Sequence, residues 1–330
     1  MAQYTSEAHD TAQHAIDSTT VNTNSSNPLL CNPETGICEL PMQQTVTNNT
    51  NALVAVEKPI KVIYYTDPIC STCWGIEPQL RKLKLEYGDI LAIEYRMGGL
   101  LPDWSYNSGG ISKPSDVAHH WDEVSGYYDM PIDGDVWLED PLHSSYPPSV
   151  AFKAAQLQDK EKAIAFLREM RTMLFLQKKN ITRWEHLAAA AVTAGLNSIQ
   201  LKEDYEGKAV ELFQEDLALA KKLAVRGFPS MFFTDAAGRT ELVYGSKPYA
   251  VYANTVAKLY PEASKRTYSK SWNDLFVKFQ SLTAKEFAEL GDVSRAASEA
   301  MLEELTAKGM LQKIESKNGS LWKMKVGKKQ

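Results

Sequence analysis

The strongest constraint in this chain of 330 residues is a pair of cysteines, Cys70 and Cys73, that lies between two segments of different periodicity. Residues 60–66 are β-branched and aromatic, and they predict a buried strand. Apolar side chains recur at roughly helical spacing over residues 73–87, which predicts a helix. Residues 90–97 predict a second strand. The pattern therefore predicts a strand, a CxxC motif, a helix and a strand, joined by a parallel crossover.

The position of the motif at the start of a helix determines its chemistry. Free backbone N–H groups and the helix dipole stabilise a thiolate there, and they lower the pKa of the first cysteine. Cys70 is therefore the candidate nucleophile, and Cys73, one turn later, can resolve a mixed disulfide. Asp67 and Glu77 are nearby negative charges that oppose this activation. We expect Cys70 to be accessible with a depressed pKa, and Cys73 to be buried.

Composition excludes several classes of protein. Aliphatic, aromatic and cysteine residues make up 44% of the chain and charged residues 23%, as in globular proteins. No stretch of roughly 18 or more apolar residues occurs, so we predict no membrane partner. No Lys or Arg precedes Lys58, so no secretory signal is predicted and we expect a cytoplasmic protein. In a reducing cytosol, a close cysteine pair is more often a reactive or metal-binding site than a structural disulfide.

We predict three regions along the chain. Residues 1–57 are rich in Asn, Thr, Ser and Gln, and they are predicted to be a disordered tail that carries Cys31 and Cys38. Residues 58–260 are predicted to form the main α/β domain, with a helical insertion over about residues 105–224 and a β-hairpin after it. A smaller unit follows.

The smaller unit, residues 262–330, is predicted to contain three helices and a hairpin. Two of the helices begin or end at capping signals, and Asn318-Gly319 is the strongest short hairpin signal. The order helix, helix, helix, hairpin is a winged-helix pattern. The sequence therefore predicts a small α+β unit that resembles a winged helix.

The charge of this unit favours a protein partner over DNA. The whole chain has a net charge of −5, but residues 261–330 have 13 basic and nine acidic side chains. The helix that would enter a DNA groove begins with Arg295 but also carries acidic groups that phosphates repel, at Glu299, Glu303 and Glu304. Lysines of the predicted wing leave a weak contact with a DNA backbone open. We expect the unit to dock a protein, and we do not expect DNA as the main partner.

With these residues in view, residues 58–260 resemble the DsbA-like branch of the thioredoxin superfamily, which includes cytosolic oxidoreductases and ClpXP adaptors. The resemblance lies in the strand before Cys70-Ser71-Thr72-Cys73-Trp74, the helical insertion, and Val225-Arg226-Gly227-Phe228-Pro229 before a strand. It implies an α/β, thioredoxin-like fold with a long helical insertion. It also implies that Pro229 is a cis-proline facing the dithiol, and that the backbone of Phe228 pairs with a substrate chain.

Trp74 is a candidate for lining the substrate groove, with core packing as the alternative. The motif also departs from the strongly oxidising periplasmic members, which have Pro-His at the positions of Ser71 and Thr72. The preceding strand offers Tyr64 and Tyr65 where related redox proteins often keep a buried acid. Donation of disulfides is therefore not expected from the resemblance.

A structural zinc site is the alternative to a redox site. It would combine Cys70 and Cys73 with Cys31 and Cys38, but the six residues between the second pair fit the usual short ligand spacing poorly. We therefore predict no metal and no other cofactor. A Pro and a Gly between Cys31 and Cys38 favour a turn, and they predict a reversible local disulfide; two idle thiols are the alternative.

Two main functions remain open on the sequence. The first is a dithiol-disulfide oxidoreductase or isomerase that acts on protein thiols and disulfides through Cys70 and Cys73. The alternative is an adaptor, in which the thioredoxin-like face binds a client and the C-terminal unit docks a partner such as a protease. A third function, a redox-sensing transcription factor, depends on the C-terminal unit alone.

Overall fold

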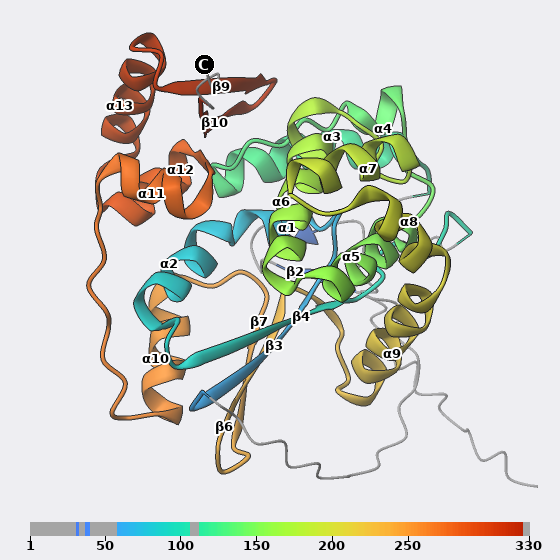
Figure 1. Ribbon diagram of the computed structural model, residues 1–330, viewed down its shortest axis with the longest axis horizontal. Coiled ribbons are helices and arrows are strands. Elements are labelled where there is room, and N and C mark those ends of the chain that lie inside the picture. Colours follow the sequence, from blue (N-terminus) through green and yellow to red (C-terminus); the bar gives the residue numbers. More distant parts are fainter. Residues whose placement is uncertain (1–30, 33–36, 40–57, 106–111, 326–330) are drawn as a thin grey trace, which may run out of the picture.

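The computed structural model describes residues 31–32, 37–39, 58–105 and 112–325; for the first two of these ranges it describes only the backbone. A mixed sheet crosses the molecule, with the helical insertion on one side of it and the C-terminal helices beyond its other side (Figure 1). In the described part of the chain, no helix is long and apolar enough to cross a bilayer.

The central sheet has four strands in the order β4, β3, β6, β7. Strand β3 (Ile60–Thr66) pairs in parallel with β4 (Leu91–Met97) and antiparallel with β6 (Ser230–Asp235), and β6 pairs antiparallel with β7 (Thr240–Tyr244). The predicted parallel crossover and the predicted hairpin are both present. Strand β3 lies between two strands and is largely buried. The loop that follows it therefore begins in the interior of the molecule.

The helix predicted over residues 73–87 is two helices, α1 (Ser71–Gly75) and α2 (Glu77–Tyr87). They meet at Ile76, whose backbone leaves the helical region with φ −91° and ψ 2°. Pro78 explains the break, because a proline inside a continuous helix lacks the N–H that should bond to the preceding turn and its ring clashes with that carbonyl. The motif residues after Cys70 thus lie in a separate short helix.

The predicted insertion consists of seven helices within the described residues, and α5 and α6 pack against each other. Helices α5 and α6 are separated by Asp159, which is extended and accepts hydrogen bonds from the N–H groups of Glu161 and Lys162. The bounds are α3 (Pro114–Tyr128), α4 (Val136–Glu139), α5 (Tyr146–Gln158), α6 (Lys160–Gln177), α7 (Trp184–Thr193), α8 (Ser198–Glu206) and α9 (Lys208–Lys222).

A second, short sheet joins the N-terminal region to the main domain. Strands β1 (Cys31–Asn32) and β2 (Ile37–Glu39) pair with each other, and β2 pairs antiparallel with β5 (Gly227–Phe228). Five residues of the predicted tail thus have a strand backbone, with β1 paired to β2 and β2 paired to β5; the rest of the predicted tail lies outside the described residues.

The C-terminal unit follows α10 (Tyr249–Leu259) and has a hydrophobic core of its own, which includes Phe276, Phe287 and Trp322. A three-residue strand that the sequence did not predict joins the hairpin, in the sheet order β8, β10, β9. The elements of the unit are α11 (Trp272–Phe279), β8 (Ser281–Thr283), α12 (Ala284–Gly291), α13 (Arg295–Ala307), β9 (Leu311–Ser316) and β10 (Gly319–Met324). The winged-helix assignment stays a prediction.

A fully buried carboxylate attaches this unit to the main domain. Glu286 accepts two hydrogen bonds from the guanidinium of Arg168, at 3.0 and 2.8 Å, and lies 3.3 Å from Nε of Arg81. It also accepts from the N–H of Thr283, so it caps α12 and binds α2 and α6 at once. Buried, paired charges of this kind fix a geometry because neither partner can separate without large desolvation costs.

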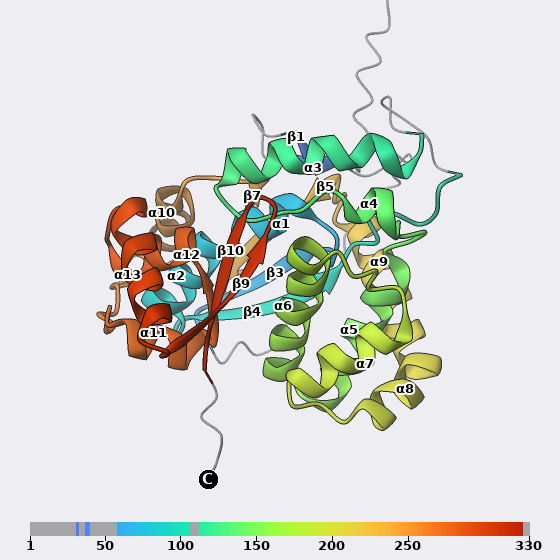
Figure 2. The same cartoon turned by 90° about the horizontal axis from the view of Figure 1, so that it is seen from above.

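The basic groups predicted for a DNA-facing surface are used inside the molecule. Arg295 pairs with Asp129 at the end of α3, and Lys317 in the β9–β10 turn pairs with Asp122 and Asp135. Figure 2 shows this hairpin reaching toward α3. Lys323 pairs with Glu169. These pairs neutralise part of the positive charge of the C-terminal unit.

Replacing Glu286 with Gln should loosen the C-terminal unit. The change leaves Arg168 buried without its anion, and breaking one partner of a buried pair costs about 3–5 kcal/mol. We expect a lower urea midpoint for the full chain and faster hydrogen exchange in β8, β9 and β10. The matched control is Glu289→Gln, which removes a partly exposed pair with Lys82 and should cost only about 0–1 kcal/mol. Equal effects of the two changes would contradict this account of the interface.

Candidate dithiol site

Cys70 occupies the N-cap of α1, as the sequence predicts for the first cysteine of the motif. Its backbone is extended, and its Sγ accepts a hydrogen bond from the N–H of Cys73 at 3.1 Å. Both residues are free cysteines. A sulfur in this position receives an N–H that the helix itself cannot satisfy, which is how an N-cap favours a negative charge.

The predicted difference in exposure between the two cysteines is wrong, because both are fully buried. Burial, together with a hydrogen bond to Cys73 and the charge of that residue, raises the pKa of Cys70 well above its usual value. Burial also opposes ionisation of Cys73, but its hydrogen bond with Cys70 and the positive charge of Arg171 outweigh burial and lower the pKa of Cys73. In this closed arrangement Cys73 gives up its proton more readily than Cys70, and Cys70 is not an activated surface nucleophile.

Helix α3 is one cause of this burial. The ring of Tyr128 lies so close to Gly75 that a Cβ at that position would be 2.5 Å from it, and the Tyr128 hydroxyl donates to Oγ1 of Thr72 at 3.5 Å. A glycine in α1 thus allows the insertion to lie directly on the motif. The expectation of an open helix end failed because periodicity does not show which helix packs over another.

Arg171 is the functional residue that the sequence analysis missed. It is fully buried in the middle of α6, donates to Oγ1 of Thr66 at 2.6 Å and to the carbonyl of Asp67 at 3.0 Å, and pairs with Glu77 at 2.9 Å. Its charge acts on the dithiol, as the lowered pKa of Cys73 shows. The only signal for it in the sequence is a basic residue on the apolar face of a predicted helix.

Asp67, between β3 and the motif, is a buried acid with a shifted pKa. Burial raises the pKa of its carboxyl to about 6, partly offset by hydrogen bonds from the N–H groups of Leu100 and Ile69 and from the Ser145 hydroxyl. The buried acid of the site therefore lies in this loop, not at Tyr64 or Tyr65 in the strand.

The predicted cis peptide bond between Phe228 and Pro229 is confirmed. Tyr65 lies opposite Ser230 in the β3–β6 pairing, so Pro229 lies where β3 ends and the chain turns toward Cys70. The Phe228 ring is fully buried against Gly98, where a Cβ would be 1.8 Å from Cζ of that ring. The cis-proline segment is thus held rigidly beside the motif.

The backbone of Phe228, predicted to pair with a substrate chain, pairs with a strand of the chain itself. Cys38 is its partner in β2, and Glu39 is the partner of Gly227. The edge predicted for a substrate is therefore a real strand edge, and β2 occupies it.

Trp74 packs in the core, which is the alternative that the sequence analysis gave. It is fully buried, its Nε1 donates to the carbonyl of Pro131 at 3.1 Å, and its ring lies 5.5 Å from that of Phe175. The guanidinium of Arg168 lies 4.2 Å from the centre of the same ring. Trp74 therefore joins the motif to the buried charges below it and has no surface open to a client.

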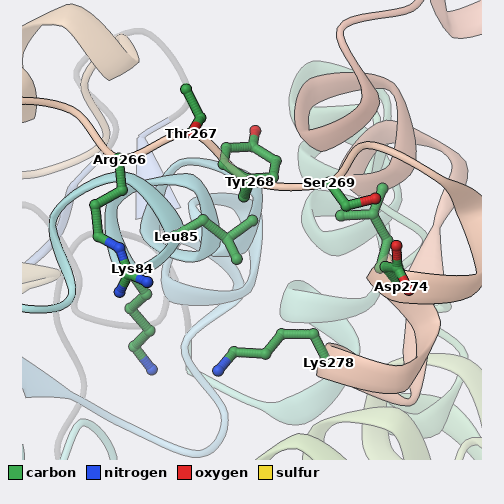
Figure 3. A pocket seen from close by; sticks show the side chains of 9 residues that line it. Lys84, Leu85, Arg266, Thr267, Tyr268, Ser269, Asp274 and Lys278 are labelled. Carbon is green, nitrogen blue, oxygen red and sulfur yellow. The ribbon is translucent and has the colours of Figure 1, made fainter.

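Among the described side chains, no group of three or more His, Cys, Asp or Glu is placed to hold a metal. The alternative zinc site with Cys31 and Cys38 lies outside these side chains. A pocket of about 230 Å³ opens between α2, the linker after α10, and α11 (Figure 3). Lys84, Arg266 and Lys278 lie around Leu85 and Tyr268 in its lining, and none of the motif residues contributes to it.

Comparison with known proteins places these features in a family. A sequence model of the thioredoxin family, described as Thioredoxin, matches residues 64–254. The ClpXP adapter protein SpxH of Halalkalibacterium halodurans is 33% identical over 299 residues, which cover 89% of this chain and 96% of the relative. The protein of the same name from Bacillus subtilis is 30% identical over 272 residues, or 81% of this chain and 90% of that protein.

Two solved structures share the fold. A putative protein disulfide isomerase from Nitrosomonas europaea aligns with a TM-score of 0.54 at 19% identity, over 62% of this chain and 100% of that chain. The cytosolic disulfide reductase DsbM from Pseudomonas aeruginosa aligns with a TM-score of 0.50 at 20% identity, over 60% and 99%. These likenesses show the fold, and the predicted thioredoxin-like α/β class with a helical insertion is confirmed.

Replacing Asp67 with Asn should remove a pH dependence of stability. The folded chain keeps a proton on Asp67 up to about pH 6, whereas the unfolded chain loses it near pH 4. The stability that this residue contributes is therefore present below pH 4 and is lost as the pH rises to 6. We expect the unfolding free energy of wild type, relative to Asp67→Asn, to fall by roughly 3 kcal/mol across this window. Urea unfolding at several pH values measures it, and a constant difference would contradict the shifted pKa.

Replacing Arg171 with Met should raise the pKa at which the dithiol first ionises, because the nearest buried positive charge is lost. Thiolate absorbance at 240 nm against pH measures this shift. We also expect a loss of about 3–5 kcal/mol in stability, since Glu77 loses a buried partner. Arg171→Lys should restore part of the pKa shift, and Arg183→Met, at an exposed pair with Asp140, is the control. An unchanged titration in Arg171→Met would show that Arg171 does not act on the sulfurs.

Proposed function

The chain belongs to the thioredoxin family and, within it, to the family of the ClpXP adapter protein SpxH; from this premise we propose that it is an adaptor that presents a client protein to a protease. Of the two functions open on the sequence, the alternative is therefore better supported than the oxidoreductase. The proposal includes a cytoplasmic location, where such a protease and its clients would meet.

The observation that carries this proposal is the fraction of this chain that aligns with each relative. The named adapter from Halalkalibacterium halodurans aligns over 89% of this chain, which requires more than residues 58–260. The disulfide isomerase structure aligns over its whole length but covers only 62% of this chain. The region outside the oxidoreductase fold is thus shared with adapters.

The C-terminal unit is suited to docking a partner. Its position is fixed by Glu286 and by ion pairs with α3 and α6, so a protein bound to it would have a defined orientation toward the main domain. It also presents exposed apolar side chains on four of its segments, which are α11, the α12–α13 turn, α13 and the α13–β9 turn: Val277, Val293, Met301 and Met310. We propose that these four side chains belong to the face of the unit that contacts a partner, which we call the docking face.

The geometry of the dithiol gives the adaptor proposal a second support. Attack on a client disulfide needs an exposed thiolate, but Cys70 is fully buried and its pKa is raised. A fold can keep the thioredoxin arrangement and use its faces for binding, because function depends on the site and not on the fold.

The oxidoreductase is the second candidate, and two observations favour it. The motif lies at the start of α1 beside a cis-proline, and Arg171 lowers the pKa of Cys73. On this proposal protein thiols and disulfides would be substrates after α3 or β2 moves away from Cys70.

A protein-turnover experiment separates the two candidates. In a strain that lacks this chain, we expect a small set of proteins to become longer-lived, measured by pulsed isotope labelling and mass spectrometry. The double variant Cys70→Ala, Cys73→Ala should restore their degradation, because presentation needs no thiol chemistry. A Met301→Asp, Met310→Asp variant should fail to restore it, because charges would disrupt the proposed docking face.

Val192→Asp is the matched control for the docking variant, because Val192 is also exposed but lies on α7, away from the C-terminal unit. It should restore degradation fully. If the Cys70→Ala, Cys73→Ala variant restored nothing, while client cysteines changed their oxidation state, the oxidoreductase would be the better interpretation.

A further inference from the structure

The β1–β2 hairpin places the two N-terminal cysteines opposite each other. In the antiparallel pairing of β1 and β2, Cys31 and Cys38 are Cα partners. Opposed Cα atoms in such a pair are about 4.5–5.5 Å apart, within the range of about 4.4–6.8 Å that disulfides span. The backbone of this hairpin can therefore carry a Cys31–Cys38 disulfide without rearrangement.

The same hairpin is docked at the edge next to the dithiol. Cys38 is the partner of Phe228, the residue before the cis-proline, and Pro229 lies where β3 ends and leads into the motif. A peptide that binds a thioredoxin-like protein by strand addition would take this position.

An internal partner also explains how a buried dithiol could react. Cys70 and Cys73 are fully buried, so a disulfide on another protein has no direct approach. A segment of the same chain that is already paired with β5 stays at an effective concentration on the order of millimolar, so it can react whenever the motif opens locally. The backbone placement and the burial of the motif are independent observations that lead to the same partner.

We propose that Cys31 and Cys38 are a second redox pair that exchanges one disulfide with Cys70 and Cys73 in the same chain. This inference goes beyond the adaptor function and does not depend on it. The hairpin would then act as a built-in substrate at the cis-proline edge.

The exchange is balanced and needs no outside oxidant or reductant. The thiolate of Cys70 attacks one sulfur of a Cys31–Cys38 disulfide, so a mixed disulfide forms and the other sulfur leaves as a thiolate. The thiolate of Cys73 then attacks Cys70, which releases the second sulfur of the hairpin. Two electrons pass from the motif to the hairpin, which ends as a dithiol while Cys70 and Cys73 end as a disulfide; the reverse direction uses the same steps.

The Cys73→Ser protein tests this proposal, because it cannot complete the second step. The full chain is oxidised with diamide, quenched with acid and N-ethylmaleimide, and digested for mass spectrometry. We expect the main cross-linked peptide to join Cys70 to Cys31 or Cys38, in a yield that does not change over a tenfold dilution. The dilution separates an internal link from a link between two chains.

Glu39→Pro in the Cys73→Ser background is the matched variant. It removes the N–H of a β2 residue paired with Gly227 and leaves every thiol in place, so the internal cross-link should fall about tenfold. A melting temperature equal to that of Cys73→Ser would show that the fold is intact. The proposal is overturned if Cys70 links only to added glutathione or to a second chain, or if Glu39→Pro leaves the cross-link unchanged. Restoration of client turnover by the Cys70→Ala, Cys73→Ala variant is a separate result and tests the adaptor alone.

Discussion

Arg171 is a full positive charge at a fully buried position, and most of the site is arranged around it. An unpaired ion in a protein interior costs several kcal/mol, so the fold must supply anions and acceptors within reach. Glu77 in α2 supplies the anion. The Thr66 hydroxyl at the end of β3 and the carbonyl of Asp67 in the loop after it supply hydrogen-bond acceptors. Satisfying one guanidinium thus fixes α6, α2 and the loop that carries Cys70 relative to one another.

The same requirement extends to the C-terminal unit. Glu77 also lies 3.5 Å from Nε of Arg81, Arg81 lies 3.3 Å from Glu286, and Glu286 pairs with Arg168. This chain of alternating charges runs from beneath the dithiol to the capping box of α12. The two hydrophobic cores are distinct, although Leu321 of β10 is buried in the core of the main domain. The charges between the cores help to set their orientation, as expected where a buried ion pair specifies geometry more than it adds stability.

The sequence predicted the elements that depend on local signals. It did not predict features that depend on packing between segments far apart in the chain. The strand over residues 60–66, the capping box at Thr283 and the cis bond at Pro229 each have a signal within a few residues, or within a motif shared with a known family. The burial of Cys70 and the role of Arg171 do not, because both depend on α3 and α6 crossing the motif from far along the chain. Hydrophobic periodicity could not predict the pairing of β2 with β5 either, because strands of two or three residues are too short to show a periodic pattern.

The count of buried charges bears on the redox chemistry of the motif. Three guanidinium groups, Arg81, Arg168 and Arg171, face two carboxylates, Glu77 and Glu286, which leaves one positive charge over. Two groups can balance it, the dithiol as a thiolate and Asp67, whose pKa of about 6 lets it ionise at neutral pH. A disulfide carries no charge, so at any pH that ionises the dithiol, oxidation of Cys70 and Cys73 removes an anion from the neighbourhood of Arg171. The buried cation therefore favours the reduced motif, and a pair whose reduced form is stabilised accepts electrons more readily than it gives them.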